Sequence, residues 1–142
     1  MSIPADLKDL VLDHVAVAVS DLEASVQLWS DLGLKFDDKR EVVEEQGVKT
    51  AFAPIDHHGH IELLEPFGES GPIHKFIEKK GPGIHHLCFK VEDVKAKGEE
   101  LKKKGYILLS DAPVKGANNC LVYFLHPKST GGVLIEISQH LG

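Results

Sequence analysis

Two histidines and two glutamates occupy equivalent places in the two halves of this sequence. His14 and His86 are 86 − 14 = 72 residues apart, and Glu62 and Glu136 are 136 − 62 = 74 apart. Imidazole and carboxylate groups together suit divalent ions such as cobalt, manganese, nickel, iron and zinc. The pattern therefore predicts one divalent ion held between the halves by these four side chains.

The four residues belong to a longer internal repeat. The offset of 72 also relates Val19 to Val91, Asp21 to Asp93, Gly33 to Gly105 and Phe52 to Phe124. After Phe124 the second copy gains two residues in a loop, so the segment around Glu136 aligns with that around Glu62 at an offset of 74. The halves are duplicates of one module.

Taken singly, each residue has an ordinary structural explanation. The histidines could be hydrogen-bonded core residues, and the glutamates could face solvent from edge strands. However, Glu62 lies within 61–64 and Glu136 within 133–137, two apolar stretches in which burying an unpaired charge would cost several kcal/mol. The four together favour a metal site, in which two carboxylates also balance the charge of the ion.

The elements that position these residues repeat as strand, helix and three strands. Residues 12–19 alternate with a β period and place His14 on a face with Ala16 and Ala18. A capping box at 20–23 starts a helix that Gly33 ends. The expected strands are 12–19, 35–43, 48–55 and 60–64 in the first half and 84–91, 106–109, 121–126 and 133–138 in the second, where the helix runs from Asp93 to Lys104.

This order predicts an α+β fold in which two tandem βαβββ modules form a curved mixed sheet around a central metal cleft. We expect a single domain over residues 1–142, with module one at about 10–66, a linker at about 67–82 and module two at about 83–139. The linker is rich in glycine and proline and contains a short helix near 73–80.

Composition narrows the classes of function. With 142 residues and a net charge of −6, the chain is not expected to bind nucleic acid or an anionic membrane. No apolar run approaches the roughly 20 residues that span a bilayer, and residues 1–9 lack the pattern of a leader, so we expect a cytoplasmic protein. Cys88 and Cys120 are expected to be reduced thiols.

Other histidines near the predicted site have ordinary interpretations. His85 should point to the opposite face of its strand from His86, outside the metal site. His57, His58 and His60 form a histidine-rich tract that could bind metal adventitiously, and a solvated turn is the preferred interpretation.

Across nearly its whole length, the chain resembles the vicinal oxygen chelate superfamily, and within it the methylmalonyl-CoA epimerases. The resemblance rests on LDHVAVAV at 12–19, EQGV at 45–48, IELLEP at 61–66, GIHHL at 83–87 and FLHPKSTGGVLIE at 124–136. The EQGV, histidine-pair and HPKS segments are the more specific ones. At 116–120 the sequence departs from the family, which more often has glycine after Gly116-Ala117.

The resemblance implies an isomerase that interconverts the 2R and 2S forms of methylmalonyl-CoA through a metal-stabilised enolate. It makes His14, Glu62, His86 and Glu136 the ligands, favours cobalt or manganese over nickel, iron or zinc, and implies a homodimer. It makes Glu45 one catalytic base. For the second base, the family suggests Glu136, and a water molecule or Glu62 is the alternative. From the residues alone, Glu45 is an exposed acid beside Glu44. Lys115 and Lys128 are candidates for the phosphates of coenzyme A.

Three other functions share features with this pattern. A lactoylglutathione lyase uses the same fold and similar ligands for proton transfer on a hemithioacetal. A drug-binding protein of the bleomycin-resistance type would lack the four ligands. A ring-cleaving dioxygenase would use two histidines and one glutamate for iron, which leaves one carboxylate unexplained.

Overall fold

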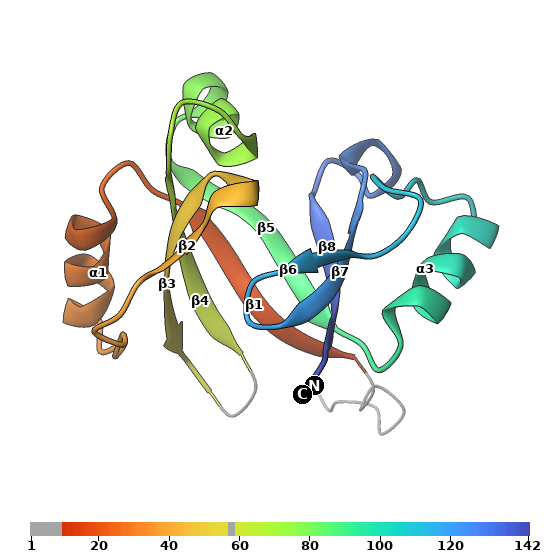
Figure 1. Cartoon of the computed structure of the whole chain (residues 1–142), viewed down its shortest axis with the longest axis horizontal. Helices are drawn as coiled ribbons and strands as arrows, with labels where there is room; N and C mark the ends of the chain where they lie inside the picture. The colour runs from red at the N-terminus through yellow and green to blue at the C-terminus, as the bar shows by residue number, and fades with distance from the viewer. Residues whose placement is uncertain (1–9, 57–58) are drawn as a thin grey trace. The chain divides into compact units, whose positions relative to one another are not determined.

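The computed structural model describes residues 10–56 and 59–142 (Figure 1). The expectations for residues 1–9 and for His57 and His58 lie outside these residues. In chain order the elements are β1 (Val11–Ala18), α1 (Leu22–Asp31), β2 (Glu41–Val43), the 3-10 helix η2 (Glu44–Gln46), β3 (Val48–Pro54), β4 (His60–Pro66), α2 (Pro72–Lys80), β5 (Gly83–Lys90), α3 (Val94–Lys103), β6 (Val114–Gly116), β7 (Cys120–Leu125), the 3-10 helix η3 (Pro127–Ser129) and β8 (Ile135–His140). Among the described residues, no helix is long and apolar enough to cross a membrane.

The contacts divide the chain into two compact units. The first-half unit comprises residues 14–85, and the second-half unit comprises residues 86–142 with the described residues that precede His14. The first contains the predicted order of strand, helix and three strands, followed by α2, and the second repeats that order with α3. The duplicated βαβββ pattern is confirmed.

The first-half unit is a mixed four-stranded sheet with a helix packed on each face. β1 pairs with β4 in parallel, while β3 pairs antiparallel with both β4 and β2. On one face Val15, Val17 and Val19 pack with α1, and on the other Ala16 and Ala18 pack with Ile73 of α2. This division of β1 into two faces is the one that its β period predicts.

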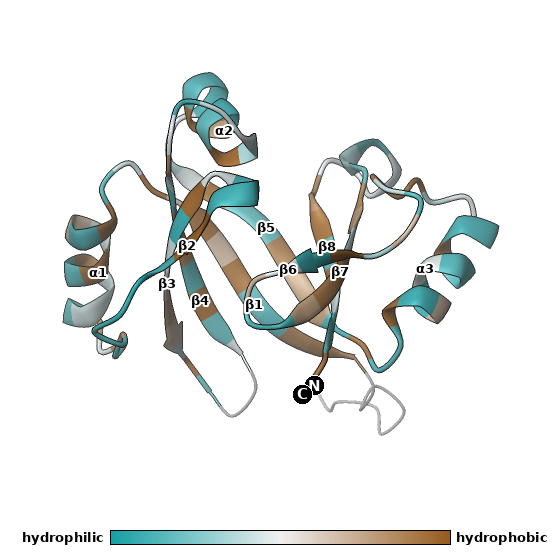
Figure 2. Ribbon diagram, in the orientation of Figure 1, coloured by the Kyte–Doolittle hydropathy of each residue, from teal (hydrophilic) through white to brown (hydrophobic). Residues whose placement is uncertain are grey.

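The second-half unit repeats this pairing. β5 pairs with β8 in parallel, and β7 pairs antiparallel with β8 and β6. Its core joins Val91 and Val94 to Tyr123, Leu125 and Ile137. Figure 2 shows hydrophobic colouring concentrated on the strands and hydrophilic stretches along α2 and α3. The apolar material of each unit therefore lies between its sheet and its helices.

Helix capping is also duplicated. Asp21 accepts a hydrogen bond from Ala24 N at 3.1 Å, and Asp93 accepts one from Ala96 N at 3.0 Å. The N-cap of α1 is therefore Asp21, not Ser20, the first residue of the predicted capping box. An aspartate at the N-cap satisfies an amide that has no partner within the helix, in the same way as serine.

A second correction concerns the strands that precede each hairpin. The predicted strand at 35–43 is reduced to Glu41–Val43. Leu34 and Phe36 do not pair as a strand; they pack in the α1 cluster, the apolar group between α1 and the sheet that is built on Val19, Leu22, Ala51, Ile61 and Leu63. At 106–109 only Leu108 forms a bridge, with Leu125, and the edge strand is Val114–Gly116. Exposed edge segments carry little apolar pattern, so their positions are hard to predict.

Candidate metal centre

The first-half unit holds one buried histidine–glutamate pair. His14 Nε2 lies 3.3 Å from Glu62 Oε2, and each residue is less than a tenth exposed, at 8% and 7%. His14 lies on β1 and Glu62 on its parallel neighbour β4. Glu62 is therefore a buried carboxylate within an apolar strand.

The second-half unit holds the equivalent pair at the equivalent place. His86 Nε2 lies 3.1 Å from Glu136 Oε1, and the two residues are 5% and 7% exposed. The strand register repeats as well, since Ala16 lies opposite Glu62 and Cys88 opposite Glu136. Both glutamates are therefore placed by the same pairing of parallel strands.

The aromatic partners of the glutamates repeat too. Phe52 lies opposite Glu62 in the antiparallel pairing of β3 with β4, and Phe124 lies opposite Glu136 in that of β7 with β8. The ring of Phe124 packs edge-on against His86, with 5.3 Å between centroids. The phenylalanines of the internal repeat are thus structural partners of the two histidine–glutamate pairs.

Each pair has the chemistry of half a metal site. An imidazole nitrogen and a carboxylate oxygen are a donor set that divalent transition ions accept. Burying a carboxylate is costly unless a positive partner compensates its charge. A divalent ion would provide that compensation, so the residues present fit the predicted group.

His60 is the residue that sequence reasoning missed. It is half-buried on β4 instead of lying in a solvated turn, and its Cα partner in the adjacent strand is His14. One donor atom each from His14, His60 and Glu62 lie within 4.8 Å of one another. The spacing of two residues between His60 and Glu62 was the available signal, because it puts both on one face of a strand.

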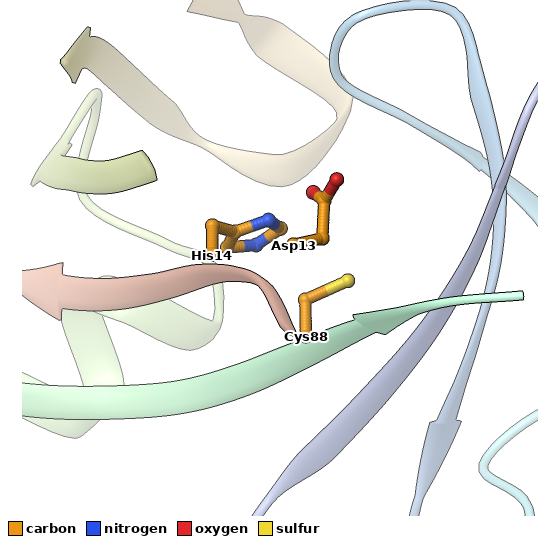
Figure 3. Close-up of side chains that lie close together, drawn as sticks. All are labelled: Asp13, His14 and Cys88. Carbon is orange, nitrogen blue, oxygen red and sulfur yellow. The ribbon is translucent and has the colours of Figure 1, made fainter. Parts of the chain in front are cut away.

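Two further side chains beside the predicted ligands have structural explanations within their own unit. Figure 3 shows Asp13 and His14 on β1, and Cys88 on β5. Asp13 Oδ1 lies 3.0 Å from His140 Nε2 in the second-half unit. Cys88 is fully buried at the place that Ala16 occupies in the first half, so its small thiol fits the same position. Cys88 and Cys120 are both thiols.

Glu45 lies on η2, between β2 and β3, where its side chain is exposed. The turn is held by Gly47, whose backbone adopts a left-handed conformation with φ 65°. A Cβ at Gly47 would stand 2.7 Å from the carbonyl oxygen of Ser70, and Gly47 O accepts a hydrogen bond of 2.7 Å from Phe67 N. The backbone after Glu45 therefore needs glycine, and it is fastened to the segment that leads into α2.

His85 and the two candidate lysines are placed as follows. The ring of His85 packs edge-on against Phe76 of α2 with 5.0 Å between centroids, which gives it a packing role in the first-half unit. Lys115 on β6 and Lys128 on η3 are both exposed. A cation on a surface segment is available to an anionic ligand, and the lysines stay candidates.

The loop that departs from the family pattern is the turn between β6 and β7. Asn118 and Asn119 have φ values of 56° and 55°. Asparagine adopts this left-handed region more readily than other residues with a Cβ, so it can replace glycine in such a turn. Asparagine at 118 can therefore adopt the same turn conformation as the glycine that is more common in the family.

A family model matches residues 13–124, that of the Glyoxalase/Bleomycin resistance protein/Dioxygenase superfamily. Mouse mitochondrial methylmalonyl-CoA epimerase is 43% identical over 132 residues, covering 90% of this chain and 72% of the mouse protein. The ethylmalonyl-CoA/methylmalonyl-CoA epimerase of Cereibacter sphaeroides is 42% identical over 131 residues, covering 90% and 96%.

A solved structure gives the same result. A variant of Streptomyces coelicolor methylmalonyl-CoA epimerase, in complex with 2-nitronate-propionyl-CoA, superposes with a TM-score of 0.87 at 34% identity. The alignment covers 92% of this chain and 97% of that one. The likeness in sequence and in structure therefore extends over nearly the whole of both proteins.

Proposed function

This chain belongs to the glyoxalase/bleomycin resistance protein/dioxygenase superfamily, and on that premise we propose that it is a metal-dependent epimerase of methylmalonyl-CoA. The observation that carries the proposal is the buried histidine–glutamate pair of each half, His14 with Glu62 and His86 with Glu136. The relatives named for this activity match 90% of the chain.

The proposed reaction inverts the carbon between a thioester and a carboxylate. Its proton must leave from one face, and another must return from the opposite face. When bound, a divalent ion supplies Lewis acidity to the substrate oxygens and stabilises the charge of the enolate. Four protein ligands would leave positions open for those oxygens in a six-coordinate ion. Cobalt or manganese is the proposed metal, with nickel, iron or zinc as alternatives.

Two carboxylates are proposed to move the protons. Glu45 would serve one face of the planar intermediate, because its carboxylate is exposed on a turn whose backbone is fixed by Gly47. Glu136 would serve the other face, which requires its carboxylate to loosen from the metal during turnover. A positioned base of this kind contributes roughly 10²- to 10⁴-fold to the rate.

The ligand bound to the Streptomyces enzyme supports the proposal that the reaction passes through an enolate intermediate. A nitronate is planar at the carbon that takes part in epimerisation and carries its negative charge on oxygen, and in both respects it resembles the enolate of methylmalonyl-CoA. The Cereibacter enzyme is named for ethylmalonyl-CoA as well. We therefore propose a substrate class of malonyl-CoA thioesters that carry a short alkyl branch, with Lys115 and Lys128 as candidates for the coenzyme A phosphates.

Exchange of the α-hydrogen in heavy water tests this function. The cobalt-loaded protein, given one epimer of methylmalonyl-CoA, should incorporate deuterium and produce the other epimer, as followed by mass spectrometry and NMR. The chelated protein should do neither until metal is restored. Conversion of methylglyoxal and glutathione without exchange on methylmalonyl-CoA would replace the proposal with a lactoylglutathione lyase.

A further inference from the structure

We propose that His60 is a third metal-binding residue of the first half, which holds the ion with His14 and Glu62 when Glu136 leaves it. The inference rests on the proposed function, because it assigns a further ligand to the same metal. The contacts of His60 that support it all lie within one compact unit.

The placement of His60 is the first observation. His60 and His14 are Cα partners in the parallel pairing of β4 with β1, and their ring centroids are 4.9 Å apart at an interplanar angle of 31°. His60 also lies two residues before Glu62, so the two side chains leave the same face of β4. Three donors from two neighbouring strands therefore gather on one side of the sheet.

The distances agree with ligation after a small adjustment. Around a six-coordinate ion with ligands at roughly 2.1 Å, neighbouring donors are about 3 Å apart and opposite donors about 4.2 Å. His14 Nε2 and Glu62 Oε2 already lie 3.3 Å apart, and all three donors lie within 4.8 Å. A side-chain rotation of His60 that brings its ring nitrogen closer to the other two donors would complete the set.

The surroundings of His60 hold its ring toward this face. Phe52, the strand partner of Glu62, packs against His60 with 5.2 Å between ring centroids. In the second half the equivalent phenylalanine, Phe124, packs against the ligand His86 itself. The first half thus has one more imidazole between its phenylalanine and its ligand pair.

The internal repeat shows that the fold does not need a histidine at this position. The offset of 134 − 60 = 74 makes Leu134 the second-half equivalent of His60. Leu134 directly precedes β8, and its carbonyl accepts a hydrogen bond from Leu87 N. The fold therefore accepts leucine at this position of the module, and His60→Leu introduces the residue that the second half already has there.

A third ligand in the first half would solve a problem posed by Glu136. A carboxylate that takes up a proton loses its negative charge and binds a metal ion more weakly. With His60 bound, the protein would keep four ligands while Glu136 is away, namely His14, His60, Glu62 and His86. Two positions of a six-coordinate ion would then stay open for two substrate oxygens.

Cobalt binding to four purified chains tests the inference: wild type, His60→Leu, Glu136→Ala and the double variant. Titration calorimetry gives the Kd, and the visible absorption of bound cobalt reports the ligand set. We expect Glu136→Ala to retain one cobalt ion. We expect the further change His60→Leu to raise the Kd at least about 10-fold and to alter the spectrum. His60→Leu alone should raise the Kd by a smaller factor, because Glu136 is still present to bind the ion.

His74→Ala is the matched control, because His74 is a histidine of the same unit that pairs with Glu78 on α2. Its Kd should equal that of the wild type. Circular dichroism checks folding, and His60→Gln replaces His60→Leu if the latter misfolds. Equal Kd values for Glu136→Ala and the double variant would overturn the role of His60 while leaving the metal in place. A wild-type chain that binds no cobalt or manganese would overturn the proposed function, and this inference with it.

Discussion

His86 Nε2 lies 3.1 Å from Glu136 Oε1, and both side chains are buried. The two residues are 50 positions apart in the sequence and meet because β5 and β8 are parallel neighbours. The first half repeats the arrangement with His14 and Glu62. Each pair is formed inside its own unit.

Removal of one imidazole should remove the metal. We expect His86→Ala to abolish tight binding of cobalt, to reduce the metal content well below one ion per chain and to abolish epimerisation. His85→Ala is the control, since His85 packs against Phe76 and should leave the metal content near normal. Elemental analysis after dialysis measures both. Equal loss of metal from the two variants would show that the ligand face of β5 is wrongly assigned.

Substitution of the proposed base should separate exchange from inversion. Glu45→Gln should keep the fold and the metal, because amide and carboxylate have similar sizes, and should slow turnover by roughly 10²-fold or more. One epimer of methylmalonyl-CoA should still exchange its α-hydrogen faster than the other, since one base remains. Glu44→Gln on the same exposed turn is the control. Wild-type inversion by Glu45→Gln would make Glu45 an ordinary surface acid.

Close packing of α3 on β7 makes Gly98 sensitive to a single methyl group. A Cβ at Gly98 would stand 2.4 Å from Cε2 of Tyr123, which is 1% exposed. Alanine favours a helix over glycine by about 1 kcal/mol, but overpacking costs about 1–3 kcal/mol. We expect Gly98→Ala to lower the free energy of unfolding by up to about 2 kcal/mol in urea denaturation. Lys95→Ala, an exposed change on α3, should have little effect.

In the first half, the helix residue is large and the strand residue is small, the reverse of Gly98 and Tyr123. The equivalents of Gly98 and Tyr123 are Val26 and Ala51, which belong to the α1 cluster, so the large and small residues are exchanged between helix and strand. The double change Gly98→Val with Tyr123→Ala should therefore cost less than the sum of its single changes. Strict additivity would show that the two residues are not coupled.

The ion pair of Arg40 with Glu23 should be visible in the acid range. Two hydrogen bonds of 2.9 and 3.0 Å from Arg40 hold the pKa of Glu23 below its ordinary value of 4.5. The lower pKa in the folded state means that the pair stabilises the protein above pH 4.5 and loses this effect as the pH falls through the folded pKa. In an NMR titration Arg40→Gln should raise the pKa of Glu23. Glu100 should not change, because its pKa is lowered by Lys97 instead.

The association state follows from the resemblance to the superfamily. We expect a homodimer, because paired modules of this kind usually associate through sheet edges or helices. Light scattering at micromolar concentration should give twice the mass of the 15.6 kDa chain. A monomer across that range would contradict the prediction. The cytoplasmic location likewise stays a prediction, which fractionation of the source cells would test.

The internal repeat of the sequence is enough to predict the βαβββ order and to single out the two histidines and two glutamates that the structure buries. Glu62 and Glu136 stand out because an apolar strand cannot bury an isolated charge without cost, and this argument needs no coordinates. The two faces of β1 follow from periodicity and the end of the first helix from Gly33, whereas its N-cap lies at Asp21, one residue after the predicted Ser20. Buried central strands carry strong patterns, so local sequence determined them.

Only the tertiary structure decided which residues meet. His60 looked like part of a solvated histidine tract, and the pairing of β4 with β1 placed it beside His14. The edge strand at Val114–Gly116 was missed, because its partner β7 decides where pairing occurs and its own residues are mostly exposed. Gly98 likewise depends on Tyr123 of β7. Sequence periodicity reports the burial of a face, whereas strand register and packing distances arise from contacts between residues far apart in the chain.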